Sequence, residues 1–483
     1  MTPQAFVFKT EPYAHQQEAL NRSCDREEFA LFMEMGTGKS KVLIDNLTHL
    51  YANGKINGAL IIAPKGVYRN WVEREIPSHM PDFIEKKIML WQPHSTKKIE
   101  AEKDEILNDT STDLRLLVMN VESLSTDKGV KFAYSFLSKH RALMAVDEST
   151  TIKNPTAKRT KNIVSLGKYA HYRRILTGSP ITRSPLDIYT QSQFLDPALL
   201  GFSSYYSFRA RYALLADGFA GGRTFKKVVG FQNLEELNST LQEFSYRVLK
   251  EDCLDLPDKV YVRREIEMSP EQKKVYSELK RYAISQLSTE ETVSATSVIT
   301  QLIRLQQVAC GFVNTDEGHP QEIKNTRMDE LLQILEETSG KAIIWANYRY
   351  DILRIEETLK KIYGEDSVGS YYGDTKDKER SEIINRFQDV DNPLRFFVGN
   401  TQTGGYGITL TAASTVIYYS NNYDLERRLQ SEDRAHRIGQ NHKVTYIDIL
   451  CKDTVDEKIV KALRNKLDLA KLVLGEEQWK EWL

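Results

Sequence analysis

Residues 29–40 read FALFMEMGTGKS, and this stretch decides the fold of the first half of the chain. Its apolar beginning predicts a buried strand, and the apolar pattern that continues from Ser40 to about Tyr51 predicts a helix. A strand, a glycine-containing loop and a helix in this order are the context of a phosphate-binding loop. Met33 stands where such loops usually have their first glycine, which lowers the specificity of the pattern.

Each residue type in the loop has a chemical reason to be there. Gly36 and Gly38 let the backbone curl so that its N–H groups face phosphates at the positive end of the helix. We expect Lys39 to reach the β- and γ-phosphates and Ser40 to bind Mg²⁺ through its hydroxyl group. Earlier in the chain, the amide of Gln16 has both a donor and an acceptor for an adenine edge. The predicted ATP-binding residues of this half are Gln16, Met35, Gly36, Thr37, Gly38, Lys39 and Ser40.

A second apolar strand, Ala142–Val146, ends in the carboxylates Asp147 and Glu148. Such a pair completes a P-loop site, because the first carboxylate holds magnesium through water and the second orients and deprotonates the attacking water. The alternative is an exposed acidic strand end, which the upstream loop disfavours. We predict that Lys39, Asp147 and Glu148 are catalytic, and that Ser40 and Asp147 are metal ligands.

Short apolar runs alternate with helical patterns in both halves of the chain. This alternation predicts an α/β protein with two domains, each a parallel sheet covered by helices. We expect a first domain over residues 1–250, with a protrusion at about 185–250. The second domain is expected over 251–483, with a protrusion at about 262–325 and a C-terminal helix at about 454–471. Because polar and helical patterns dominate between Pro185 and Asn325, we expect helices there rather than a third sheet. The runs are Phe29–Met33, Ala59–Ala63, Leu114–Met119, Leu143–Val146, Arg174–Leu176, Ala342–Trp345, Gly369–Tyr372, Leu394–Val398, Thr415–Tyr419 and Val444–Leu450.

The overall charge and the cysteines exclude some classes of protein. The 483 residues carry 66 Lys and Arg against 67 Asp and Glu, so a positive field over the whole molecule is absent. This disfavours a nucleic-acid coating protein but is compatible with basic residues confined to one cleft. The four cysteines lack the spacing of a zinc or redox site, which indicates free thiols. No signal pattern or membrane-spanning run occurs, so we expect no membrane and a cytoplasmic, nucleoid-associated protein, or one in the host cytoplasm if phage-encoded.

Residues 430–440 read QSEDRAHRIGQ. On a helix, Gln430, Arg434 and Arg437 would project from one face. Two guanidinium groups aimed together suit a triphosphate in its transition state, so we predict that both arginines are catalytic and that Gln430 binds ATP. The alternative is a solvated basic helix face. Because Lys39 and Glu148 belong to the first domain, we expect the site to be complete only when the domains close.

Together these motifs resemble the Swi/Snf-type ATPases of the superfamily-two helicases, and the resemblance extends nearly from end to end. It implies two RecA-like P-loop lobes with helical protrusions, a C-terminal helix that braces lobe against lobe, ATP and Mg²⁺ as ligands, and duplex DNA held across both lobes. The segments that carry it are 63–65, 70–71 with Glu75, 152–154, 176–181, 256–259, 269–272 with Tyr276, 401–413 and 433–440.

The resemblance also implies which residues lie near the DNA backbone. Contacts of this kind carry no sequence information and suit a motor that remakes them at every step. The alternative for the threonines is a capping or packing role. The residues are Lys65, Asn70, Thr177, Asn347, Thr401 and Gly404.

Two departures from the family pattern affect the expected function. Ser149 and Thr150 follow the acidic pair where the family usually has alanine and histidine. In the family the fourth residue connects the nucleotide site to the DNA-binding motifs, so the shorter, uncharged Thr150 puts the strength of that coupling in question. No targeting or nuclease motif is evident, so we expect a compact, monomeric prokaryotic or phage-like version and no nucleosome remodelling.

We therefore expect an ATP-dependent translocase on duplex DNA that remodels branched DNA or displaces bound proteins. The alternatives are a strand-separating helicase of the same superfamily and an ATP-gated DNA-binding switch. An RNA-dependent ATPase is disfavoured by the segments at 401–413 and 433–440.

Overall fold

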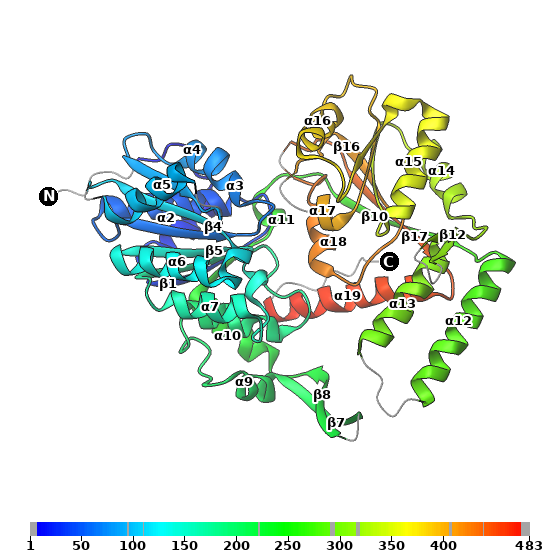
Figure 1. The fold of residues 1–483 in the computed structure, drawn as a ribbon, viewed down its shortest axis with the longest axis horizontal. Coiled ribbons are helices and arrows are strands. Elements are labelled where there is room, and N and C mark those ends of the chain that lie inside the picture. Colours follow the sequence, from blue (N-terminus) through cyan, green and yellow to red (C-terminus); the bar gives the residue numbers. More distant parts are fainter. Residues whose placement is uncertain are drawn as a thin grey trace. The chain divides into compact units, whose positions relative to one another are not determined.

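The computed structural model describes residues 7–93, 96–109, 111–220, 223–289, 295–314, 319–404, 408–437 and 439–474. The chain forms two compact units, each built around one parallel sheet (Figure 1). Within the described ranges, no helix combines the length and apolar character needed to cross a bilayer. Residues 405–407 and 438, which belong to two of the motif segments above, lie outside these ranges.

The first sheet has seven strands in the order β3-β4-β2-β5-β6-β1-β9, and every neighbouring pair is parallel. All six residues of β2 are buried, so both faces of the sheet are covered, as a parallel sheet requires. Apolar residues of α2 pack with one of these faces in a single hydrophobic cluster. The strands are β1 Glu28–Met33, β2 Gly58–Ala63, β3 Lys86–Leu90, β4 Leu114–Asn120, β5 Ala142–Asp147, β6 Tyr172–Leu176 and β9 Ser245–Val248.

The helices of this half of the chain connect those strands and follow them. They are α1 Ala14–Ser23, α2 Lys39–Ala52, α3 Tyr68–Asn70, α4 Ile76–His79, α5 Lys97–Asn108, α6 Asp127–Lys139, α7 Lys158–Gly167, α8 Ile188–Leu195, α9 Tyr205–Tyr212, α10 Leu234–Phe244 and α11 Lys250–Cys253. A π-helical turn and three 3-10 turns complete the set: η1 Trp71–Glu75, η2 Val121–Ser125, η3 Ser149–Ile152 and η4 Pro185–Asp187.

The second sheet has six strands in the order β10-β17-β16-β13-β15-β14, again all parallel. The strands are β10 Lys259–Ile266, β13 Lys341–Trp345, β14 Val368–Tyr371, β15 Phe396–Gly399, β16 Ala413–Tyr418 and β17 Val444–Cys451. The helices are α12 Pro270–Thr289, α13 Ala295–Cys310, α14 Arg327–Glu337, α15 Arg349–Tyr363, α16 Asp377–Gln388, α17 Thr401–Gly404, α18 Leu425–Glu432 and α19 Val455–Leu474, with a 3-10 turn η5 Glu365–Ser367.

Every strand expected from an apolar run is present, and the α/β class is confirmed. The expectation of helices alone between Pro185 and Asn325 is wrong. That region also contains two hairpins, β7 Ala213–Ala220 with β8 Arg223–Phe231 and β11 Phe312–Asn314 with β12 Pro320–Glu322. It contributes β9 and β10 to the main sheets as well. Strand β10 escaped detection because it lies at the edge of its sheet and is only partly buried, so it lacks an apolar run.

Candidate active site

The loops of the first unit that carry the predicted catalytic residues meet at one edge of its sheet. Because neighbouring strands are parallel, their carboxyl ends lie on the same side. Leu176 at the end of β6 pairs with Leu31 of β1 on one side and with Asp147 of β5 on the other. The sheet therefore gathers the phosphate-loop segment, the acidic pair and the loop that follows β6.

The phosphate loop has the backbone that its glycines predict. Gly36 and Gly38 have φ values of 83° and 89°, a left-handed conformation that residues with a Cβ rarely adopt. Gly38 is the N-cap of α2, which begins at Lys39. The carbonyl oxygen of Glu34 accepts hydrogen bonds from the Thr37 hydroxyl at 2.8 Å and from the Lys39 ammonium at 3.3 Å. These contacts hold the loop curled, with half-buried Ser40 in the first turn of α2.

Gln16 lies against this loop. Its Nε2 donates to the Thr37 carbonyl at 3.1 Å, and its Oε1 accepts from the Tyr13 N–H at 3.1 Å. A Cβ on Gly38 would lie 2.2 Å from Gln16 Nε2, so the two residues pack with no space between them. His15 Nε2 also lies 2.8 Å from the Thr37 carbonyl. Gln16 is thus placed at the phosphate loop, and its adenine contact stays a prediction.

Asp147 is held by two N–H donors. The indole Nε1 of Trp71 donates to Oδ2 at 2.9 Å, and the Glu148 N–H donates to Oδ1 at 3.0 Å. Burial raises the pKa of Asp147 above its usual range, while the charge of Lys39 and these two donors oppose the rise. The effect of Lys39 on this pKa means that the two predicted catalytic groups interact. Trp71, which begins the π-helical turn η1, is a positioning residue for this carboxylate; the sequence placed it in a family motif but gave it no role.

Glu148 has a left-handed backbone, with φ 49° and ψ 61°. For a residue with a Cβ this conformation costs about 1–2 kcal/mol and is found mostly where function demands it. The same residue is the N-cap of the 3-10 turn η3, which follows β5 directly. The strain fits a functional role for this residue.

The two unusual residues after the acidic pair are both buried. The Ser149 hydroxyl donates to Oε1 of Gln191 at 2.6 Å, and Nε2 of Gln191 donates to the carbonyl oxygen of Pro180 at 2.8 Å. Pro180 follows the Thr177 loop in the chain. Ser149 is therefore linked through one buried amide to the loop after β6, where the predicted DNA residue Thr177 lies.

The loop after β6 packs directly on the phosphate loop. A Cβ on Gly178 would lie 3.1 Å from the backbone nitrogen of Met35. Thr177 is only 1% exposed, and its hydroxyl oxygen accepts from the Ser179 N–H at 3.1 Å. Arg247 donates to the Gly178 carbonyl at 2.9 Å and so fixes this contact. Arg247 comes from β9, far along the sequence, and no local pattern pointed to it.

Of the other predicted DNA residues in this unit, Lys65 is exposed and Asn70 is half-buried. The Asn70 side chain donates to Oε1 of Glu75 at 3.1 Å. Both follow the carboxyl end of β2, next to β5 in the sheet. They therefore lie on the same edge of the sheet as the phosphate loop.

In the second unit, three predicted DNA residues gather at the carboxyl edge of the sheet. Asn347 follows β13, and its N–H donates to the Ser420 hydroxyl at 2.8 Å. The Asn400 side chain donates to the Asn347 carbonyl at 2.8 Å and so connects this loop to the start of α17. Thr401 and Gly404, the first and last residues of α17, are both buried.

The two predicted catalytic arginines are close together, but not in the way we expected. Helix α18 ends at Glu432, so the prediction that Arg434 and Arg437 share a helix face with Gln430 is wrong. Arg434 Nε donates to the Gln430 carbonyl at 2.8 Å, which caps the last turn of α18. Both guanidinium groups instead lie at the carbonyl oxygen of Ile408, at 3.1 Å for Arg434 and 3.4 Å for Arg437.

Gln430 itself is buried on α18. Its Nε2 lies 3.4 Å from Oε1 of Glu426. Its Oε1 is a buried acceptor without a hydrogen-bond partner among the described residues. Buried acceptors of this kind need an explanation, and a ligand donor is one.

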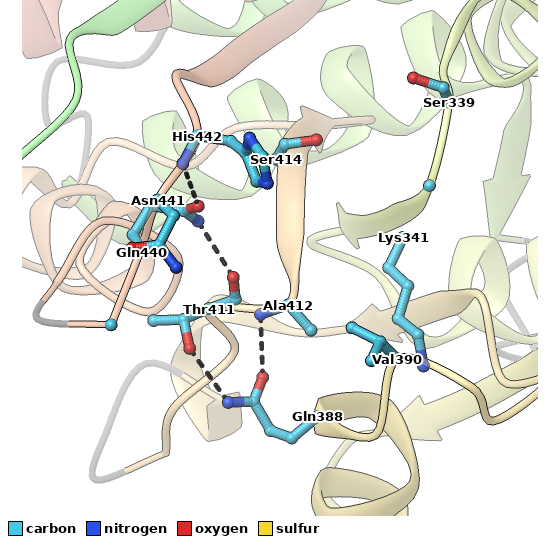
Figure 2. A pocket seen from close by; sticks show the side chains of 12 residues that line it. Ser339, Lys341, Gln388, Val390, Thr411, Ala412, Ser414, Gln440, Asn441 and His442 are labelled. Atoms are coloured by element: carbon cyan, nitrogen blue, oxygen red, sulfur yellow. Dashed lines mark hydrogen bonds between the residues drawn. The ribbon is translucent and has the colours of Figure 1, made fainter.

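A pocket of about 510 Å³ lies beside Gln440, three residues after Arg437 (Figure 2). It includes Lys341, Ser414 and His442, which lie at or just before the amino ends of β13, β16 and β17. Gln440 donates through Nε2 to the carbonyl oxygens of Thr411, Ala413 and Ala435. The pocket thus lies at the edge of the sheet opposite Asn347. Gln440 links Ala435, which lies between the two arginines, to the start of β16.

Comparison with known proteins identifies the family. The model of the SNF2-related domain matches residues 15–312, more than half of the chain. The chain belongs to the SNF2-related family. A helicase conserved C-terminal domain matches residues 324–439, so this SNF2-related protein has both halves of a helicase-like, ATP-using core.

Several proteins are similar over most of this chain. A SWI/SNF chromatin-remodeling complex subunit, snf22, of Schizosaccharomyces pombe is 25% identical over 90% of the chain and 26% of its own length. An uncharacterized ATP-dependent helicase of Mycoplasma pneumoniae is 24% identical over 96% of the chain and 42% of its own length. The SNF2-related chain thus spans about a quarter to two fifths of these relatives. The Sulfolobus solfataricus SWI2/SNF2 ATPase core in complex with dsDNA is 23% identical, with a TM-score of 0.43, over 98% of this chain and 94% of that one.

Proposed function

We propose that this SNF2-related protein hydrolyses ATP to ADP and phosphate and uses the energy to move along duplex DNA. The observation that carries the proposal is the meeting of Lys39, Asp147 and Glu148 at one edge of the first sheet, in a chain of this family. Branched DNA or DNA-bound proteins would be what the movement remodels or displaces. We propose a monomer that acts where its DNA is, at the nucleoid or in the cytoplasm of a phage host.

The proposed nucleotide site uses the backbone of residues 35–40. The left-handed glycines orient N–H groups toward phosphates, and the start of α2 adds its positive dipole end. Lys39 would leave the Glu34 carbonyl for a phosphate oxygen. Gln16 and Gln430 are the amides that we assign to the nucleotide, the first to the adenine edge.

Ser40 and Asp147 fit a magnesium ion, because they supply only oxygen donors, which Mg²⁺ prefers. The bound ion would neutralise phosphate charge. Asp147 must be ionised for this role, and the Trp71 and Glu148 N–H groups favour its ionised form. Glu148 would orient and deprotonate the attacking water, for which its fixed, strained backbone provides a set position.

Arg434 and Arg437 are assigned to the charge that develops on the phosphates during transfer. Their shared position at Ile408 supports this assignment, since two guanidinium groups held at one carbonyl can turn to one anion. Because they belong to the second unit, we propose that turnover requires closure of the units, which is how hydrolysis would produce movement.

We propose that the six predicted DNA residues act in two ways, some by direct contact with the backbone and others by shaping the loops that contact it. Lys65, Asn70 and Asn347 have exposed or half-buried side chains that can reach a phosphate. The buried Thr177, Thr401 and Gly404 would act by shaping loops whose backbone N–H groups would face the DNA.

The proposal is tested by steady-state ATPase rates of the full chain without nucleic acid and with duplex DNA, single-stranded DNA or RNA. We expect stimulation of at least tenfold by duplex DNA and little by the others. Preference for single strands would favour the strand-separating helicase and reject the proposal. Tight ATP-dependent DNA binding with no stimulation would favour an ATP-gated switch.

A further inference from the structure

Three metal-ligating side chains meet on the first unit, away from the proposed nucleotide site. Cys24 and Asp25 follow α1, and His49 lies in the last turn of α2. Their ligand atoms (one sulfur, one carboxylate oxygen and one ring nitrogen) all lie within 4.8 Å of one another. Cysteine spacing could not reveal this group, because only one of its members is a cysteine.

Two of the distances in the group are close to those around a tetrahedral ion. The Cys24 sulfur lies 3.6 Å from Oδ2 of Asp25, and Nε2 of His49 lies 3.4 Å from Oδ1 of the same carboxylate. With the usual bond lengths, tetrahedral zinc holds a sulfur and an oxygen about 3.5 Å apart and a nitrogen and an oxygen about 3.3 Å apart. The two contacts use different oxygens of the carboxylate, so Asp25 would bind the ion either through both oxygens or after its side chain turns.

The loop that carries Cys24 and Asp25 is held in place by a buried arginine. Arg174, on β6, donates to the carbonyl oxygens of Ser23 and Arg26, each at 2.7 Å. Its Nε donates to Oδ1 of Asn46 on α2, and Nδ2 of Asn46 donates to the Cys24 carbonyl at 3.2 Å. The ligand-bearing loop and α2 are therefore fixed to each other before any ion binds. Such preorganisation lowers the cost of metal binding.

We propose that Cys24, Asp25 and His49 bind a divalent transition metal of the zinc class, with water as the fourth ligand. Sulfur and imidazole nitrogen together select such ions over Mg²⁺ or Ca²⁺. Asp25 is exposed, so the site is open to a water ligand.

The proposed metal would act as a structural clamp. His49 lies ten residues after Lys39 on the same helix, about 15 Å along its axis at 1.5 Å per residue. At that distance the ion does not touch the phosphates. It would instead join the end of α1, whose first turn carries Gln16, to the end of α2. This role goes beyond the proposed motor function and does not depend on it.

The test is anaerobic titration of the reduced full chain with Co²⁺, a spectroscopic substitute for Zn²⁺. We expect a thiolate-to-cobalt charge-transfer band that saturates at one equivalent and that Zn²⁺ abolishes by competition. C24S should remove the band, and H49Q and D25N should each weaken Co²⁺ binding at least tenfold. C253S, which alters a half-buried cysteine outside the group, should leave the titration unchanged.

Thermal unfolding gives a second measurement that does not need the cobalt spectrum. Zn²⁺ should raise the midpoint of the wild type and of C253S, but not that of C24S, whose midpoint without metal should equal that of the wild type. A band of full intensity in C24S would assign the binding to another cysteine. That result, or the absence of any band at a tenfold excess of Co²⁺, would overturn the proposal.

Discussion

The indole nitrogen of Trp71 donates to Oδ2 of Asp147 at 2.9 Å, across 76 residues of sequence. This bond connects the segment after β2 to the proposed metal ligand at the end of β5. It stabilises the ionised carboxylate against the burial that raises its pKa.

Trp71→Phe should therefore shift the pH dependence of ATP hydrolysis. Loss of the donor raises the pKa of Asp147 further, and activity requires the ionised form. The acidic limb of the rate profile should move to higher pH by about one unit, since a hydrogen bond to a charged group contributes roughly 1.5 kcal/mol or more. The measurement is kcat/KM for ATP against pH at saturating Mg²⁺.

Trp91→Phe is the matched control. Trp91 is as deeply buried as Trp71, but its Nε1 has no hydrogen-bond partner among the described residues. The acidic limb of the pH–rate profile of W91F should lie at the same pH as in the wild type. An equal shift in both variants would show that Trp71 acts only through packing.

Glu148→Gln should lower ATP turnover by about 10²- to 10⁴-fold, the usual contribution of a general base, and leave nucleotide binding within a few-fold of wild type. Glu148→Gly should lose the same activity but relieve the left-handed backbone. We expect it to unfold with a free energy up to about 1 kcal/mol above that of E148Q. DNA-dependent activity that survives in E148Q would show that the base lies elsewhere.

Arg437→Ala should reduce kcat by about 10³-fold or more, as for other arginines that act on transferring phosphates, and should spare ATP binding. Arg437 is the better residue to substitute, because Arg434 is buried and also caps α18. Arg386→Ala, which removes a guanidinium paired with Asp366 at the surface of the same unit, should have normal activity. Loss of ATP binding in R437A would point to a folding role.

Ser149→Ala should weaken coupling between DNA and turnover. It removes the donor to Gln191 and with it the link toward Pro180, while the acidic pair stays in place. We expect the ATPase rate without DNA to change less than twofold and the stimulation by duplex DNA to fall several-fold. The free energy of unfolding should fall by about 1–3 kcal/mol, because a buried acceptor loses its donor.

Ser245→Ala provides the comparison for that variant. Its buried hydroxyl donates to the Leu241 carbonyl at 2.7 Å, away from the acidic pair. S245A should lose a similar free energy of unfolding, and duplex DNA should stimulate its ATP hydrolysis as strongly as that of the wild type. If both serine variants lose stimulation alike, stability rather than the Ser149 link is responsible.

Local patterns predicted the fold class and the proposed catalytic residues of the first unit, because each of these residues stands next to the apolar strand or glycine loop that identifies it. Lys39 follows its loop directly, and Asp147 ends an apolar strand. The contacts of Trp71 and Arg247 escaped prediction because their partners are brought near only by the order of strands in the sheet.

The end of α18 was mispredicted for a related reason. Spacing alone placed Arg434 on a helix face, but its side chain turns back to the Gln430 and Ile408 carbonyls. The Arg434 guanidinium caps the last turn of α18 by donating to the Gln430 carbonyl, and its other acceptor, Ile408, lies 26 residues earlier in the chain. A spacing rule within one segment cannot include such a partner.

Movement along duplex DNA is tested most directly by the release of a short third strand bound to a long duplex. With ATP, the wild-type protein should release the third strand after a delay that grows with its distance from the protein's entry site, and E148Q should not. Release that is independent of that distance, or no release while duplex DNA stimulates ATP hydrolysis, would contradict translocation.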